Sequence, residues 1–231
     1  LVILASVAES TGRAPDADRL GNEAISLIRK WVTANARKPE GMKALAEACE
    51  QQARLRNTGR WGRESSSTEA EALMQEAVSL KRELCAFSDS TSEDHISLAR
   101  TLLEFIRLMP DRDNSELVLE AARVLAKAEQ SAELPAVAKV TKAFLILHAR
   151  WENINWKELP QGWVKDEQGM KGPAAWRLAH EVYDAYPDDV NVKLELALLC
   201  KHWQRDLKRD PEGGVAALGA KIANDLTRLD P

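Results

Sequence analysis

The sequence has few cysteines. Only three occur among 231 residues, namely Cys49, Cys85 and Cys200, and no two of them form a C-x-x-C pair. An odd number of widely spaced cysteines argues against a disulfide scaffold and is typical of a protein in a reducing compartment. We therefore expect a cytoplasmic protein.

Motifs that carry enzyme chemistry are also absent. The sequence contains neither a G-x-S-x-G nor a G-x-x-x-x-G-K motif. Cys200 and His202 are two residues apart, so on a helix they point in different directions. The run from Asp111 to Asn114 begins like a calcium loop but lacks the later glycine and glutamate, which favours a helix-capping turn.

We therefore predict no catalytic, cofactor-binding or metal-binding residues, no cofactor, and a protein that is not an enzyme. An enzyme of unrecognised type stays open as an alternative. It would need a cluster of acid, base or nucleophile side chains that only folding brings together.

A strong excess of positive charge is missing as well. Lysine and arginine number 32 and aspartate and glutamate 36, which gives a net charge of −4 and argues against a dedicated nucleic-acid surface. Two basic clusters beside a tryptophan could still grip a nucleic-acid strand: Arg54, Arg56, Arg60 and Arg63 around Trp61, and Lys201, Arg205, Lys208 and Arg209 near Trp203. Both fall at predicted helix C-termini, where the helix dipole favours cations, so we interpret them as structural.

No apolar run is long enough to cross a membrane. The first residues, LVILASVAES, are too few to span a bilayer and lack the features of a secretory signal. We expect no membrane partner. Leu1 to Val7 are interpreted as one apolar face of a helix that is cut partway, and the chain as part of a larger protein.

What the sequence does contain is helical periodicity, with hardly any strand-like alternation. One predicted buried face carries Leu20, Ala24, Leu27, Ile28 and Trp31. Ser90 with Glu93 fits a capping box at the start of a later helix. About nine helices are predicted, at residues 16–36, 40–58, 67–87, 93–108, 114–130, 135–151, 173–186, 189–207 and 212–229.

Several predicted helices end near a proline, at Pro39, Pro187 and Pro231, with small or apolar residues such as Ala175 and Ala179 upstream. This pattern resembles the tetratricopeptide-repeat (TPR) superfamily, although the proline intervals exceed its 34-residue period and its usual first-helix tryptophan, glycine and tyrosine are mostly missing. The resemblance implies an all-α fold, either a TPR-like α-solenoid or an irregular bundle of antiparallel helix pairs. It also implies one helical-repeat domain over residues 1–231 that presents a surface to another protein.

One irregular segment, the inserted loop at residues 152–172, interrupts the helical pattern and is rich in tryptophan. In one interpretation Trp151, Trp156 and Trp163 fold back and cover an apolar seam between helices. In the other, Trp156 and Trp163 bind a partner protein, and the polar distal half at residues 165–172 is exposed to proteases. Met170 and Lys171 then form the predicted cleavage site.

The Met170-Lys171 bond, set in a loop of a helical protein, resembles the cleavage site in the helical substrate of the caspase-like protease of type III-E CRISPR systems. That resemblance implies a regulatory substrate whose cleavage releases a partner or an active fragment in antiviral defence. Our main functional prediction is a non-catalytic protein–protein interaction module or regulatory scaffold, with the protease substrate as the alternative.

Overall fold

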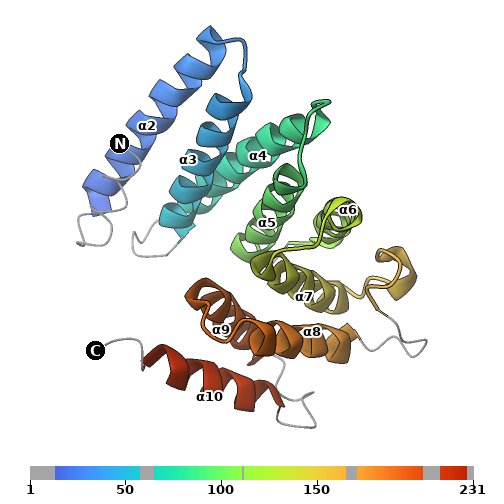
Figure 1. Ribbon diagram of the computed structural model, residues 1–231. Coiled ribbons are helices and arrows are strands. Elements are labelled where there is room, and N and C mark those ends of the chain that lie inside the picture. The colour runs from blue at the N-terminus through green and yellow to red at the C-terminus, as the bar shows by residue number, and fades with distance from the viewer. Residues whose placement is uncertain (1–13, 58–64, 111, 165–170, 205–213, 228–231) are drawn as a thin grey trace. The chain divides into compact units, whose positions relative to one another are not determined.

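The computed structural model of the chain is built from helices (Figure 1). It describes residues 14–57, 65–110, 112–164, 171–204 and 214–227. Within these residues there are nine α-helices and one 3-10 turn, and no strand. This confirms the predicted all-α fold, and the helix bounds lie close to the predicted ones. The elements are α2 (Ala14–Ala34), α3 (Pro39–Asn57), α4 (Ser65–Ala86), α5 (Ser92–Leu108), α6 (Ser115–Ser131), α7 (Ala136–Trp151), η1 (Trp156–Glu158), α8 (Lys171–Ala185), α9 (Val190–Gln204) and α10 (Gly214–Thr227).

The helices group into two compact units, Leu1–Arg112 and Asp113–Pro231. Helices α2 to α5 belong to the first unit, and η1 and helices α6 to α10 belong to the second. The sequence analysis predicts one domain over residues 1–231, and whether the two units act as one domain stays a prediction. Each unit is described by itself.

The first unit is centred on α3, which packs mainly on α4 and also on α2 and α5. Large side chains such as Met42 and Met74 are fully buried, and Cys49 lies among them. The core is lined by Ile25, Val32, Met42, Leu45, Ala46, Ala48, Cys49, Ala77, Leu80 and Leu84. Close packing of this kind gives each helix one buried face, as the periodicity predicted.

The predicted buried face of α2 is partly wrong. The structure buries Ala24, Ile25 and Val32, whereas Leu27 is 50% exposed and Trp31 is 45% exposed. Gly21 of α2 lies against Gln52 of α3, and Ala17 and Ala24 on the same side of α2 are buried, since small residues allow two helices to approach closely. The Trp31 indole lies beside that contact, where it covers Gly41 of α3.

Helix α5 begins one residue later than the predicted capping box requires. Thr91, not Ser90, is the N-cap: its side-chain oxygen accepts a hydrogen bond from the Asp94 backbone N–H, and the Asp94 carboxylate accepts one from the Thr91 backbone N–H. Serine and threonine are comparable caps, so the sequence alone does not choose between neighbouring candidates.

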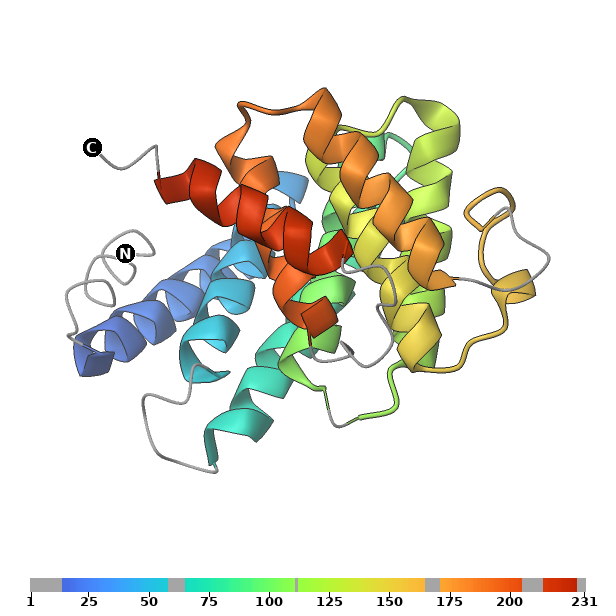
Figure 2. The ribbon, with the colours of Figure 1, turned by 90° about the horizontal axis from the view of Figure 1, so that it is seen from below.

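The second unit is built around α7, which packs on α6, α8 and α9. Figure 2 shows α7 beside α6 and α8 from a second direction. Four consecutive side chains of α7 are almost fully buried, namely Phe144, Leu145, Ile146 and Leu147. Every residue from Ala143 to Ala149 is buried, which places all sides of this stretch in the core, so α7 is the central helix of this unit.

Candidate functional site

The segment that connects α7 to α8 is packed against the second unit in its first half. Helix α7 ends at Trp151, and the chain then turns through Asn153, whose φ of 55° lies in the left-handed region that asparagine tolerates. Four side chains from this half are buried, namely Ile154, Leu159, Trp163 and Val164, each at most 7% exposed. The connection is therefore an anchored structure as far as Val164.

Trp163 makes the most specific of these contacts. It is 6% exposed, and its indole N–H donates a hydrogen bond of 3.1 Å to the Glu129 Oε2 atom on α6. The Lys142 Nζ atom on α7 lies 2.8 Å from the Glu129 Oε1 atom and 5.0 Å from the centroid of the Trp163 ring. One lysine thus neutralises the acceptor and adds a cation–π contact to the same indole.

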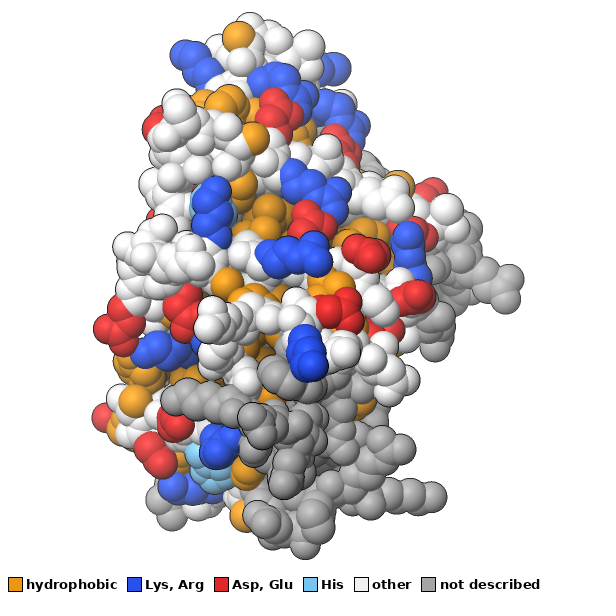
Figure 3. Space-filling view, turned by 90° about the vertical axis from the view of Figure 1, so that its right-hand side faces the viewer, with side chains coloured by type: hydrophobic (Ala, Val, Ile, Leu, Met, Phe, Trp, Pro, Cys, Tyr) orange, Lys and Arg blue, Asp and Glu red, His pale blue; other side chains and the backbone are white. Residues whose placement is uncertain are grey.

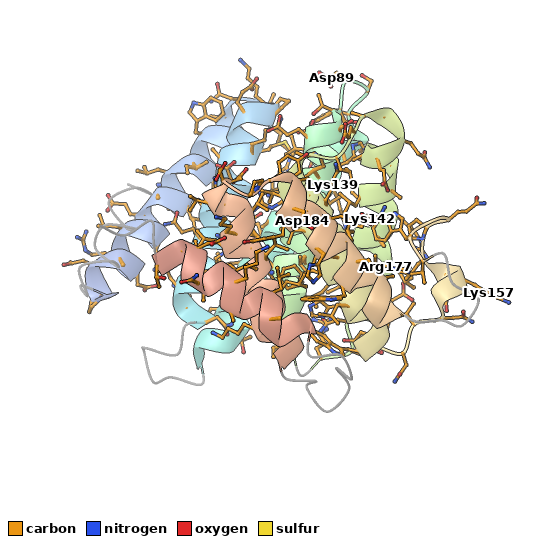
Figure 4. All side chains as sticks on the ribbon, turned by 60° about the horizontal axis from the view of Figure 1, so that its bottom comes forward. Asp89, Lys139, Lys142, Lys157, Arg177 and Asp184 are labelled. Atoms are coloured by element: carbon orange, nitrogen blue, oxygen red, sulfur yellow. The ribbon has the colours of Figure 1, made fainter. Side chains whose placement is uncertain are left out.

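Lys142, which contacts both Glu129 and the Trp163 ring, lies on α7. Figure 4 shows Lys139 and Lys142 on α7, next to Arg177 and Asp184 on α8, with Lys157 on the α7–α8 connection. Lys139 binds Glu133 at 2.8 Å, so this lysine is also engaged within the unit. The hydrogen bond and opposite charge of Glu133 raise the pKa of Lys139 above its ordinary value.

The sequence-predicted site residues occupy different surroundings. Trp163 is engaged inside the unit, and the interpretation that Trp151, Trp156 and Trp163 together cover a seam stays a prediction. Trp156 opens the η1 turn. Lys171 is the first residue of α8, and Met170 lies outside the described residues. The roles of Trp156 and Trp163 in partner binding, and of Met170 and Lys171 in cleavage, stay predictions.

A surface that the sequence analysis did not single out lies on α9. Val190, Leu194 and Leu198 are 43%, 50% and 43% exposed, and their spacing of four residues places them along one side of the helix. We call these three residues the α9 stripe. Leucines recur around most of α9. The sequence therefore contains more apolar residues in this helix than one buried face requires, and this excess is the signal that could have indicated the stripe.

Cys49 and Cys200 are buried, Cys85 is half-buried, and His148 and His180 pack against tryptophan rings. Burial raises the pKa of Cys49 to about 12 and that of Cys200 to about 11, so both are neutral thiols near pH 7. His148 packs edge-on against Trp151, and His180 against Trp176, with ring centroids 4.8 Å and 4.3 Å apart.

The first basic cluster is neutralised where the structure describes it. Arg54 binds Glu104 at 2.9 Å, and Arg56 binds Asp18 at 3.0 Å and Glu69 at 2.6 Å. Arg60 and Arg63 lie outside the described residues, as do Arg205, Lys208 and Arg209 of the second cluster. On the face shown in Figure 3, side chains of both signs alternate among the described residues instead of gathering into a patch of one sign.

Comparisons with known proteins add no family. No protein-family model, no curated protein and no solved structure matches the chain. In the described parts of the chain, no helix is both long enough and apolar enough to span a bilayer.

Proposed function

We propose that this chain is a non-catalytic protein-interaction module, acting as a scaffold or regulatory element that binds another protein through apolar helix faces. The observation that carries the proposal is the α9 stripe. Removing apolar surface from water contributes roughly 25 cal/mol per Å². A contiguous patch of large apolar side chains that stays in water therefore marks an interaction site. Leu27 and Trp31 of α2 form a second, smaller apolar surface in the first unit.

The TPR-like architecture is part of the same proposal. In each unit successive helices pack on one another, and contacts also join next-but-one helices, α3 with α5 and α7 with α9. Arrays of helix pairs show this pattern of neighbouring contacts and use their surfaces to bind other proteins. Pro187 lies two residues after Ala185, the last residue of α8, which fits the resemblance drawn from the sequence.

Photo-crosslinking tests the interaction. A photoreactive residue in place of Leu194 should give a defined crosslinked product in extract of the native host, and Leu198→Asp in the same chain should abolish it. The matched control carries the photoreactive residue at Glu181, an exposed polar position on α8. Both leucines are exposed, so circular dichroism and the melting temperature should not change. Equal crosslinking at both positions, or a product that survives Leu198→Asp, would contradict the proposal.

The second candidate is a regulatory substrate that a protease cuts within residues 165–172. The observation in its favour is that the chain is anchored on both sides of this segment, by Trp163 before it and by α8 after it. The type III-E CRISPR setting remains a proposal that rests on the Met170-Lys171 bond. Its direct test is incubation with the caspase-like protease of such a system, followed by N-terminal sequencing of the fragments.

The packing also predicts what a cut would do. Cleavage at Met170-Lys171 separates α7 from α8 in the chain, but these helices pack closely and Ala175 and Ala179 of α8 are fully buried. The two fragments should therefore stay together. Limited trypsin digestion mapped by mass spectrometry, then size exclusion, should show early cutting at Lys165 or Lys171 with co-eluting fragments. Protection of both lysines while other sites are cut would rule out the substrate hypothesis.

A further inference from the structure

A pocket of about 130 Å³ opens in the first unit where three helices meet. Helix α3 supplies Lys43 and Glu47, α4 supplies Lys81 and Leu84, and α5 supplies Glu93 and Asp94. Helix α5 follows the turn that carries Asp89, which is labelled in Figure 4. The pocket therefore combines one apolar wall with a ring of charged groups.

Both lysines of the pocket already have acidic partners. The Lys43 Nζ atom lies 2.7 Å from the Asp94 Oδ1 atom. The Lys81 side chain is only 8% exposed, and its Nζ atom lies 2.5 Å from the Glu50 Oε1 atom, which also accepts a hydrogen bond from Thr101. An anionic ligand would have to displace a carboxylate from one of these pairs, so the lysines do not make the pocket an anion site.

Two carboxylates at the pocket remain available. Glu47 and Glu93 are exposed, and neither makes a hydrogen bond or ion pair with another residue that the structure describes. The negative field of Glu93 reaches Lys43, since it contributes to raising the pKa of that lysine, after the hydrogen bond that Lys43 donates to Asp94. Lys43 is paired with Asp94 and Lys81 with Glu50, so Glu47 and Glu93 are the two pocket carboxylates without a paired cation, and their charge favours a cationic ligand.

We propose that this pocket receives the cationic end of a lysine or arginine side chain of the partner protein, an inference that rests on the proposed interaction function. The aliphatic stem of such a side chain would pack on Leu84, and its charged end would lie between Glu47 and Glu93. A cavity on the order of 150 Å³ holds a benzene-sized group, so this pocket has room for one side chain. The N-terminus of α5 also attracts anions, but the Thr91–Asp94 capping box already supplies a carboxylate there.

Side-chain probes test the proposal with the intact chain. The ¹⁵N-labelled chain is titrated with N-acetyl-arginine methylamide or N-acetyl-lysine methylamide and followed by NMR. The backbone amide signals of Glu47, Glu93 and Ser97 should shift. A midpoint of about 1–10 mM is expected for one charge-assisted contact. N-acetyl-norleucine methylamide, which has the stem without the charge, should cause no such shifts.

Single substitutions give the quantitative control. Glu47→Gln and Glu93→Gln should each raise the midpoint about tenfold, because each removes one charged acceptor. Glu23→Gln should leave it unchanged, because Glu23 lies on α2 outside the pocket. All three positions are exposed, so the variants should fold, which the dispersion of the amide spectrum verifies.

Three results would overturn the pocket proposal: no shifts with either cationic probe, equal shifts with the norleucine probe, or tighter binding of N-acetyl-glutamate methylamide than of the cationic probes. The crosslink at Leu194 separates this failure from that of the proposed function. A specific crosslink without probe binding would refute the pocket alone. Probe binding without a crosslink would support a cation site and contradict the protein-interaction function.

Discussion

The contact between Trp163 and α6 allows a stability prediction that also bears on the role of the α7–α8 connection. Trp163→Ala removes a nearly buried indole and its hydrogen bond to Glu129. A buried tryptophan removes about 200 Å² from water, worth about 5 kcal/mol at 25 cal/mol per Å². Part of that area is already covered in the unfolded chain, so we expect a loss of about 3 kcal/mol in the free energy of unfolding.

The hydrogen bond can be measured separately with a double-mutant cycle of Trp163→Phe, which removes the donor, and Glu129→Ala, which removes the acceptor. Phenylalanine keeps most of the apolar contact and lacks the N–H donor. The Glu129 side chain is 40% exposed, which screens its charge, so we expect a coupling energy of about 1 kcal/mol. Urea denaturation of the four chains, monitored by circular dichroism, gives the required free energies.

Two results would refute this reasoning. A loss below about 1 kcal/mol for Trp163→Ala would mean that the connection is not anchored, because surface substitutions commonly have effects of about that size or less. A coupling energy near zero would mean that the indole N–H and the carboxylate do not interact in solution. Either result would make Trp163 available again as the exposed partner anchor that the sequence analysis predicts.

Three further predictions concern the first unit. Gly21→Ala would place a Cβ atom 1.8 Å from the Oε1 atom of buried Gln52 and force that amide from its hydrogen bonds to α2. Alanine has the higher helix propensity, but urea denaturation should still show a net loss of about 1–2 kcal/mol in the free energy of unfolding. Burial raises the pKa of Asp94, but the hydrogen bonds it accepts outweigh burial and hold the pKa below its ordinary value. This carboxylate thus stabilises the fold above its unfolded-state pKa, and the contribution is lost as the pH falls through the folded-state pKa, a loss that should disappear from acid titrations of Asp94→Asn. A thiol reagent near pH 7 should label Cys85 and spare Cys49, which is fully buried with a pKa of about 12, and rapid labelling of more than one thiol would contradict the packing.

Local patterns were enough to predict the helices. Amphipathic spacing and capping residues act within one or two turns, so the elements from α2 to α10 could be placed from neighbouring residues alone. The errors are also local in origin. Thr91 and Ser90 are both suitable caps, and on α2 the buried face is formed by Ala24, Ile25 and Val32 while Trp31 stays half exposed against Gly41.

The candidate sites were less predictable because distant residues assemble them. Trp163 and Glu129 are 34 positions apart, and no short-range pattern links them. The pocket of the first unit takes its walls from three helices. The α9 stripe depends on which leucines the neighbouring helices cover, and the apolar periodicity of α9 gives no preference among them.

The burial of α7 on every side has a consequence for the order in which the protein is synthesised. When a ribosome has released the chain only as far as Trp151, the run from Phe144 to Leu147 has α6 to pack on but neither α8 nor α9. The nascent second unit would then expose the apolar run of its central helix, the condition under which chaperones bind and chains aggregate. The first unit would already have emerged complete, so stalled or truncated products ending between α7 and α9 should be the chaperone-dependent ones.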